Sequence, residues 1–345
     1  MGRYLTIVAA TGMVLAGVSG ALAMNVETVP VGNPGNAGEW AGESYGGYGP
    51  DRICGAVDYT YNIGKYEVTA GQYTEFLNAV AATDTHGLYN PNMDTALNSY
   101  GCNIKQTGSS GSYQYSVASE WANRPVNFVT FWDACRFSNW LQNGQLIGAQ
   151  DLTTTEDGAY FLNGVTYPTN TSITRKADAT WVIPTEDEWY KAAYYDPDTI
   201  FGGPGYYDYP THSNFPYVPV SDDLVDPDPG HNATCKNDDY TIDSPYWRTE
   251  VGAHENSDSP YGTFDQGGNV WEWNETLFYV FGGYRRGTRG GSFDLSSSYL
   301  HASSDNFYSP DIVAANHGFR VAYVPEPATL CFLALGGLAA VRRRR

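Results

Sequence analysis

The chain has 345 residues, of which 15% are aromatic, and it carries 38 acidic against 19 basic side chains, a formal net charge of −19 at pH 7. So acidic a protein is repelled by phosphate backbones and by anionic lipid headgroups, which argues against nucleic acid or an anionic membrane surface as its partner. The composition fits bound cations, or contact with neutral or basic surface polymers.

The N-terminus has the pattern of a secretory signal peptide. Arg3 precedes an apolar run over about residues 5–22, and Ala21-Leu22-Ala23 is a small-residue cleavage site. A transmembrane anchor is the alternative, but glycines dilute the run and the cleavage site closes it. We predict a signal peptide over residues 1–23, a mature chain that begins near Met24, and an N-terminal extension over residues 24–54.

Two helices are predicted in the first half of the chain. Residues 61–69 form a short strand that runs into a helix, in which Thr69 and Gln72 have the spacing of a capping box. One face of this helix is apolar: Tyr73, Phe76, Leu77 and Val80. A second helix follows Thr130, with an apolar stripe made by Ala134, Phe137, Trp140 and Leu141.

A third helix is predicted over residues 185–193, where Pro184 prevents extension towards the N-terminus and Thr185 and Glu188 form a capping box. Acidic residues in a first helical turn serve the cap and the helix dipole, so we assign Glu186, Asp187 and Glu188 no acid/base role. Residues 201–247 are rich in Pro, Gly, Asp and Tyr without periodicity, which predicts loop held by packed aromatic side chains.

Three glycine-containing motifs follow: Gly267-Gly268-Asn269-Val270-Trp271-Glu272-Trp273, then Arg289-Gly290-Gly291-Ser292-Phe293, then Gly318-Phe319-Arg320. Together with Lys65-Tyr66-Glu67-Val68-Thr69 and the second and third helices, they resemble the formylglycine-generating enzyme (sulfatase-modifying factor) family over residues 55–323. The resemblance implies one α+β domain, a variation of the C-type-lectin fold with short strands, short helices and much ordered loop.

In that family's oxidases, a cysteine pair binds copper and drives oxygen-dependent oxidation of a substrate cysteine. The matching positions here are Leu295 and Leu300. Copper(I) prefers thiolate ligands, which leucine cannot provide, so we expect no copper and no catalytic residue. Trp271, Ser292 and Tyr299 match other positions near the family's active-site cleft, and with the two leucines they are expected to line it.

The resemblance also implies a structural calcium ion. Carried over by position, Asp265 and Glu272 would provide side-chain oxygens, and Gly268 and Val270 their carbonyls, which suits a cation that prefers oxygen ligands. The alternative is that the glycines only turn the chain into a strand whose Trp271 fills the core.

A second family calcium site begins at an Ala-Asn pair, for which Asn232 and the carbonyl of Ala233 are the candidates here. The surrounding residues do not align, and the nearby acids could equally be solvated loop residues: Asp238, Asp239 and Asp243.

The cysteines and histidines predict no further metal or redox site. Outside the C-terminal tail there are four cysteines, which allow three pairings into two disulfides or remain buried thiols, and no two have Cys-x-x-Cys spacing: Cys54, Cys102, Cys135 and Cys235. Cys135 and Cys235 belong to segments far in sequence from Leu295. The six histidines include no i, i+4 pair and are predicted to be surface or capping residues: His86, His212, His231, His254, His301 and His317.

The C-terminus resembles a PEP-CTERM sorting signal over residues 324–345. Val324-Pro325-Glu326-Pro327 precedes an apolar segment over residues 328–341 that contains Cys331, and four arginines end the chain. The segment is shorter than the roughly 20 residues of a full span, and its arginines would hold its end on the cytoplasmic side. By resemblance, an exosortase would cut near the motif after transient membrane contact and pass the protein to the surface or matrix of a Gram-negative-type bacterium.

These patterns predict an exported module that binds or supports structure, stabilised by calcium and without oxidase chemistry, whose ligand is a matrix polysaccharide or a surface protein. An enzyme of the formylglycine-generating type, or another protein-modifying activity using a different ligand set in the same cleft, is the alternative. A passive coat component is a third possibility.

Overall fold

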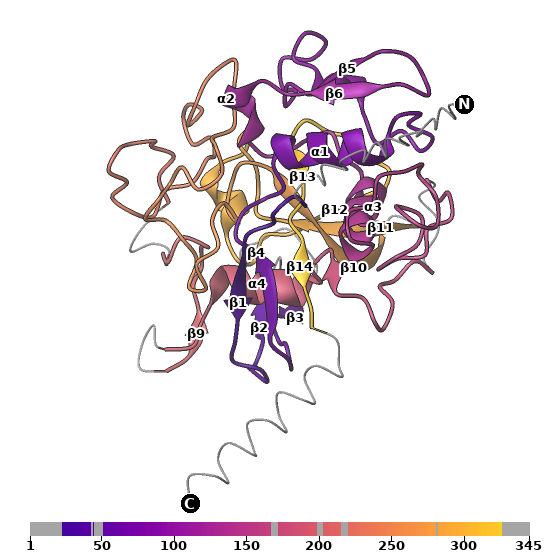
Figure 1. The fold of residues 1–345 in the computed structure, drawn as a ribbon. Coiled ribbons are helices and arrows are strands. Elements are labelled where there is room, and N and C mark those ends of the chain that lie inside the picture. Colours follow the sequence, from indigo (N-terminus) through magenta and orange to yellow (C-terminus); the bar gives the residue numbers. More distant parts are fainter. Residues whose placement is uncertain are drawn as a thin grey trace, which may run out of the picture.

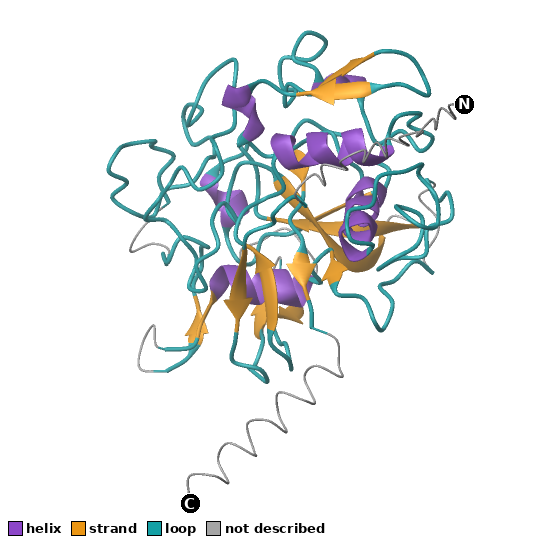
Figure 2. Ribbon diagram, in the orientation of Figure 1, coloured by secondary structure: helices purple, strands orange, loops and turns teal. Residues whose placement is uncertain are grey.

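The computed structural model describes residues 23–42, 44, 51–166, 172–198, 203–214, 220–280 and 282–325. Residues 1–22 of the predicted signal peptide and residues 326–345 of the sorting segment, with Cys331, lie outside the described residues. Short helices and strands are joined by long loops (Figures 1 and 2), which confirms the predicted α+β class. None of the helices in the described ranges has the length and apolar character needed to cross a bilayer.

One four-stranded sheet joins the two ends of the domain. Its order is β1-β4-β14-β7, and all its pairs are antiparallel: β1 (Thr28–Val31), β4 (Tyr61–Gly64), β14 (Ala322–Tyr323) and β7 (Trp181–Val182). Ala322 pairs with Ile63 on one side and with Val182 on the other. Segments from the start, middle and end of the chain therefore share one set of hydrogen bonds.

A second four-stranded sheet has the order β12-β11-β10-β13: β12 (Asn306–Tyr308), β11 (Gly283–Arg289), β10 (Trp271–Val280) and β13 (His317–Gly318). β10 and β11 form an antiparallel hairpin with a shift of register between Trp273 and Leu277, and β13 runs parallel to β10. Trp271 is thereby placed beside His317. The sheet brings all three glycine-containing motifs together.

The remaining described elements are small. Three two-stranded pairs are β2 (Glu39–Ala41) with β3 (Arg52–Cys54), β5 (Lys105–Thr107) with β6 (Gln114–Ser116), and β8 (Tyr195–Asp196) with β9 (Gly205–Tyr206). The short helices are α2 (Ser119–Ala122), η2 (Pro91–Met93) and η3 (Ser297–Leu300). In the described part of residues 201–247, β9 is the only strand besides isolated bridges, which confirms the loop prediction.

The three predicted helices are confirmed as α1 (Ala70–Val80), α3 (Phe131–Gln142) and α4 (Glu186–Tyr194). Each begins after a threonine that accepts a hydrogen bond from the third residue of its helix, namely Thr69, Thr130 and Thr185. All three caps are complete capping boxes; in α3 the reciprocal partner is Asp133. The predicted apolar faces of α1 and α3 are buried.

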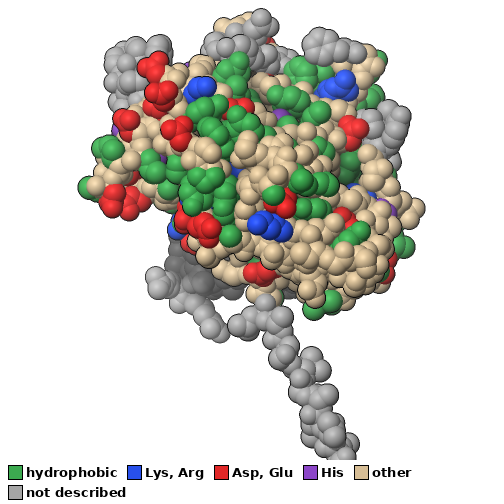
Figure 3. All heavy atoms as spheres, turned by 90° about the horizontal axis from the view of Figure 1, so that it is seen from above, with side chains coloured by type: hydrophobic (Ala, Val, Ile, Leu, Met, Phe, Trp, Pro, Cys, Tyr) green, Lys and Arg blue, Asp and Glu red, His purple; other side chains and the backbone are tan. Residues whose placement is uncertain are grey.

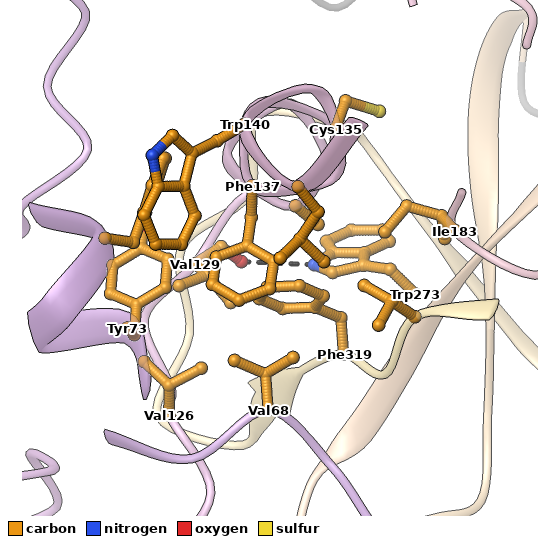
Figure 4. Packing of buried hydrophobic residues seen from close by; sticks show 14 of the residues in the cluster. Val68, Tyr73, Val126, Val129, Cys135, Phe137, Trp140, Ile183, Trp273 and Phe319 are labelled. Atoms are coloured by element: carbon orange, nitrogen blue, oxygen red, sulfur yellow. Dashed lines mark hydrogen bonds between the residues drawn. The ribbon is translucent and has the colours of Figure 1, made fainter. Parts of the chain in front are cut away.

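Aromatic side chains supply much of the core, as the composition predicts. The Phe137 ring of α3 lies 5.3 Å from Phe76 of α1 and 5.4 Å from Phe319. Figure 4 shows this cluster, in which the fully buried Trp273 donates its indole N–H to the Val129 carbonyl at 3.1 Å. These rings join β10 to the helices.

The acidic first turn of α4 is more than a cap. Glu186 is buried between Arg289, at 2.6 Å, and Arg52, with which it also pairs. Glu188 caps the helix and is 2.9 Å from Arg175. The prediction of a structural role stands, but the role is mainly ion pairing with arginines far away in the sequence.

All four described cysteines are free and buried, so the buried-thiol alternative is the one the structure supports. Burial raises the pKa of Cys54 and of Cys235 to about 12. A thiol with so high a pKa is protonated at neutral pH and is a poor ligand or nucleophile.

Glu39 in β2 gives the fold a specific pH dependence. Burial raises the pKa of its carboxyl group from 4.5 to about 7, against the hydrogen bond that Tyr190 donates at 2.6 Å. Between these pH values the folded chain holds a proton that the unfolded chain releases, so the free energy of unfolding falls as the pH rises through this window. We expect Glu39→Gln to be more stable than the parent at pH 8 by about 1–3 kcal/mol and equal to it at pH 4.

Urea unfolding at the two pH values measures this difference. The exposed Glu75→Gln is the matched control and should leave the pH dependence unchanged. Equal stability of Glu39→Gln and the parent at pH 8 would contradict the assignment to Glu39.

Candidate functional site

The three glycine-containing motifs are joined by backbone hydrogen bonds. The Gly268 amide donates to the Gly290 carbonyl at 2.9 Å, and the Phe293 amide donates to the Asn269 carbonyl at 2.9 Å. The Trp271 amide donates to the carbonyl of Asn316 at 2.8 Å. The candidate calcium residues and the candidate cleft residues are therefore parts of one bonded unit.

Arg320 and Glu272 form the buried centre of this unit. Two guanidinium nitrogens of Arg320 lie 2.6 Å from the two carboxylate oxygens of Glu272, and the Trp189 indole N–H donates to the same carboxylate at 2.7 Å. Arg320 also donates to the carbonyls of Gly64 and Phe264, each at 2.9 Å. The pair holds β10, α4 and the chain around residues 64–65 together.

Two further carboxylates share this one arginine. Glu67 accepts from the Val270 amide and from the Asn269 side chain, each at 3.2 Å, and Asp265 accepts from the Gly252 amide at 2.6 Å. Burial raises the pKa of Asp265 to about 6 and that of Glu67 well above its usual range, with the neighbouring carboxylates adding to both shifts. Three carboxyl groups thus face one arginine, and the raised pKa values show that the fold without a cation disfavours negative charge on Glu67 and Asp265.

The oxygen atoms of these carboxyl groups are of the type that calcium prefers, although Glu272 is already engaged by Arg320 and Trp189. In the described part of the chain, no three side chains of His, Cys, Asp or Glu are arranged to hold a metal ion. A cation here would thus depend on the carbonyls of Gly268 and Val270 as well as on Asp265 and Glu272. When bound, calcium would supply structural charge neutralisation.

At the second candidate position, Asn232 is buried and donates from its side chain to Asp228 at 2.6 Å. Asp228 also accepts from the Gly230 amide and the Ser257 hydroxyl, and these bonds outweigh desolvation, the largest single influence, so its pKa is lowered. The neighbouring Ala233 is also buried, whereas three aspartates are exposed: Asp238, Asp239 and Asp243. Asp228 was not predicted from the sequence. The Asp-x-Gly pattern of a turn at residues 228–230 was the feature that could have indicated it.

Leu300 lies fully buried in an apolar cluster, whereas Leu295 is half-buried. The cluster contains Tyr209, Val220, Ala233, Cys235 and Leu300, with Tyr299 packed against it. The sequence separation of Cys235 from this region was therefore misleading, because the fold packs it in the same cluster as Leu300. It is the only cysteine in the cluster, and its raised pKa keeps it a thiol.

The predicted cleft residues lie next to a polar group that includes two residues missed from the sequence, Asp294 and Asn316. Ser292 donates its hydroxyl to Asp294 at 2.7 Å, and the Asn316 amide donates to Asp294 at 3.2 Å. The Trp271 ring is fully buried and meets the half-buried Tyr299 edge to face at 6.3 Å. Asp294 directly follows one motif and Asn316 lies two residues before another, and this proximity was the available signal.

The surface prediction for histidine is wrong at two positions. His254 is buried, with a ring nitrogen 3.1 Å from the Thr234 hydroxyl. His317 is buried between aromatic rings, at 4.4 Å from Tyr308 and 5.3 Å from Trp273, and burial lowers its pKa to about 3. Neutral imidazole fills space in the core, which a lone histidine in a sequence does not reveal.

Solved structures with similar folds include three proteins of low identity. CarF is 19% identical with a TM-score of 0.48, over 87% of this chain and 99% of that one. Treponema denticola variable protein 1 is 17% identical with a TM-score of 0.47, over 88% and 99%. PvdO from Pseudomonas aeruginosa is 16% identical with a TM-score of 0.43, over 87% and 92%. No curated protein matches the chain.

Two family models match adjoining parts of the sequence. The PEP-CTERM protein-sorting motif matches residues 324–345, which indicates export by the exosortase pathway of Gram-negative bacteria. The sulfatase-modifying factor enzyme 1-like domain matches residues 54–324, most of the chain. The protein therefore belongs to the sulfatase-modifying factor enzyme 1-like (FGE-sulfatase) family, as its motifs predicted.

Proposed function

We propose that this protein is an exported binding module of the cell surface or extracellular matrix, and that it has no formylglycine-generating oxidase activity. The observation that carries the proposal is the apolar packing of Leu300 at a position where the family's oxidases need a thiolate. Copper(I) finds no soft ligand pair there, because Leu295 offers none and the nearby Cys235 is a buried thiol.

Calcium has a structural role in this proposal. Asp265 and Glu272, with the carbonyls of Gly268 and Val270, are the residues that would hold it, and the excess of buried carboxylates around Arg320 supports its binding. The weaker candidates Asn232 and Ala233 would need Asp228, which already accepts several hydrogen bonds.

The ligand is a matrix polysaccharide or a surface protein. An acidic chain with the partly exposed ring of Tyr299 near the family's cleft suits a neutral or basic polymer, because rings stack on sugar faces while carboxylates repel anionic chains. The PEP-CTERM motif implies recognition by exosortase, and the apolar segment before the terminal arginines would contact the membrane only during sorting.

The decisive experiment incubates a cysteine-containing sulfatase-type peptide with oxygen and the copper-treated full chain, and follows conversion to formylglycine by mass spectrometry. We expect no conversion, and calcium but no copper in the purified protein. The matched variant is Leu295→Cys with Leu300→Cys, which returns both thiols to the scaffold and should gain copper binding. Conversion by the parent chain, or stoichiometric copper or iron in it, would support the enzyme alternative.

Binding is tested on columns of host exopolysaccharide and of host surface protein. Retention that is lost on adding EDTA supports a calcium-stabilised binding module. Absence of retention on every fraction, with self-assembly of the purified chain, would instead indicate a passive coat component.

A further inference from the structure

Three half-buried aromatic rings pack together next to the Gly-Gly-Ser-Phe motif, tilted or edge to face to one another. The Trp247 ring lies 5.1 Å from Tyr100 and 4.9 Å from Tyr240, and we call these three residues the aromatic platform. Beneath the platform, the buried Phe293 lies 5.9 Å from Tyr100 and 6.3 Å from Tyr240. The platform is therefore supported by the Gly-Gly-Ser-Phe motif itself.

Trp247 is held in an unusual backbone conformation. Its φ is +60°, in the left-handed region that bulky residues rarely adopt. Its amide donates to the Asp243 carbonyl at 3.3 Å, and its indole N–H donates to the Ser99 carbonyl at 3.1 Å. Strain maintained by such bonds is frequent at binding sites, where it fixes a side chain for a ligand.

A fixed carboxylate lies at the edge of the platform. Asp294 directly follows Phe293, is half-buried, and is held in place by Ser292 at 2.7 Å and by Asn316 at 3.2 Å. Within the described ranges it makes no ion pair with lysine, arginine or histidine. Its carboxylate therefore has no direct cationic partner, although the buried Arg248 lies close enough to interact with its charge.

The surroundings of the platform favour a cationic ligand. The loop that carries Tyr240 and Trp247 also carries three exposed aspartates, Asp238, Asp239 and Asp243. Its two cations are the buried Arg248 and Lys236, whose ammonium group lies 4.3 Å from the Tyr240 ring and covers one of its faces. Figure 3, which views the molecule of Figure 1 from above, shows acidic side chains gathered on its left, the side on which the loops of about residues 220–260 lie in Figure 1. An anionic polymer would be repelled by these carboxylates, and a neutral polymer would form no ion pair with Asp294.

We propose that the aromatic platform and Asp294 together bind a polysaccharide of amino sugars that carry free ammonium groups. The flat face of a pyranose ring stacks on Trp247, whose ring meets that of Tyr240 edge to face, and an ammonium group pairs with Asp294. Ring faces also attract cations, so stacking and charge act in the same direction. The inference rests on the proposed binding function and names its ligand class.

The test measures retention and Kd of the full chain on immobilised polyglucosamine, on the same polymer after N-acetylation, and on a neutral glucan. We expect binding to polyglucosamine that weakens with added salt and falls at least about tenfold after N-acetylation. Trp247→Ala and Asp294→Asn should each weaken it by about tenfold. The matched controls, Tyr284→Ala and Asp178→Asn, change an exposed tyrosine and an exposed aspartate outside the platform and should have no effect.

Asp294→Asn keeps the shape and hydrogen-bonding oxygen of the side chain, so it tests the charge even if Trp247→Ala fails to fold. Equal binding before and after N-acetylation, or equal competition by polylysine, would overturn the inference. Binding to a neutral or acidic polymer alone would overturn it while leaving the proposed binding function intact. Binding to no polymer and no surface protein would overturn both.

Discussion

Replacing Arg320 by methionine is expected to lower the free energy of unfolding by about 3–5 kcal/mol. The guanidinium group is fully buried, and its loss leaves the Glu272 carboxylate without its charge partner beside Glu67 and Asp265. Two backbone carbonyls, of Gly64 and Phe264, also lose a donor. Denaturant unfolding of the two proteins at pH 7 measures the effect.

The double variant Arg320→Met with Glu272→Gln separates lost charge pairing from lost packing. It removes the unpaired carboxylate, so we expect it to recover a large part of the stability lost in Arg320→Met. Arg320→Lys keeps the charge but not the two-pronged geometry and should be intermediate. Equal stabilities of the single and double variants would show that charge at Glu272 is not the cause.

Gly268→Ala is expected to destabilise the fold by about 3–5 kcal/mol. The residue has a φ of +95°, and an added Cβ would lie 2.2 Å from the Thr234 carbonyl oxygen. That oxygen belongs to backbone bonded to the Asn269 amide at 2.8 Å, so it cannot move away without breaking the contact between two loops. Thermal unfolding followed by circular dichroism measures the loss.

Gly262→Ala is the matched control for this variant. Its φ of +80° imposes the same backbone strain, but nothing lies within 4 Å of the added Cβ. We expect a loss of only about 1 kcal/mol. A similar loss at both positions would mean that the backbone conformation, and not the close approach of Thr234, requires glycine at position 268.

The helices were predictable because their signals are local. A threonine cap, its partner three residues later and an apolar face all lie within one short segment, as Thr69, Gln72 and Phe76 illustrate. The ion pairs were not predictable. Glu186 pairs with Arg289, which lies about a hundred positions away, and neither segment has a sequence pattern that identifies its partner. Buried charge pairs are decided by the topology of the whole domain.

The candidate site was predicted in part for the same reason. Asp265 and Glu272 could be matched by motif, and the fold places both near Arg320. The position of Cys235 beside Leu300 and the burial of His317 depend on loops without periodicity, so the sequence gives no measure of these distances. The aromatic platform likewise joins Tyr100 to a loop more than a hundred residues later.

The sheet formed by β1, β4, β14 and β7 imposes an order of events on the export of this protein. Its strand β14 ends at Tyr323, directly before the sorting motif at residues 324–345, and it lies between β4 and β7. The sheet cannot close until almost the whole chain has been synthesised and has left the translocation channel. Closure would therefore coincide with the arrival of the sorting segment at the membrane, so that exosortase would meet a domain that has only just become able to complete its folding.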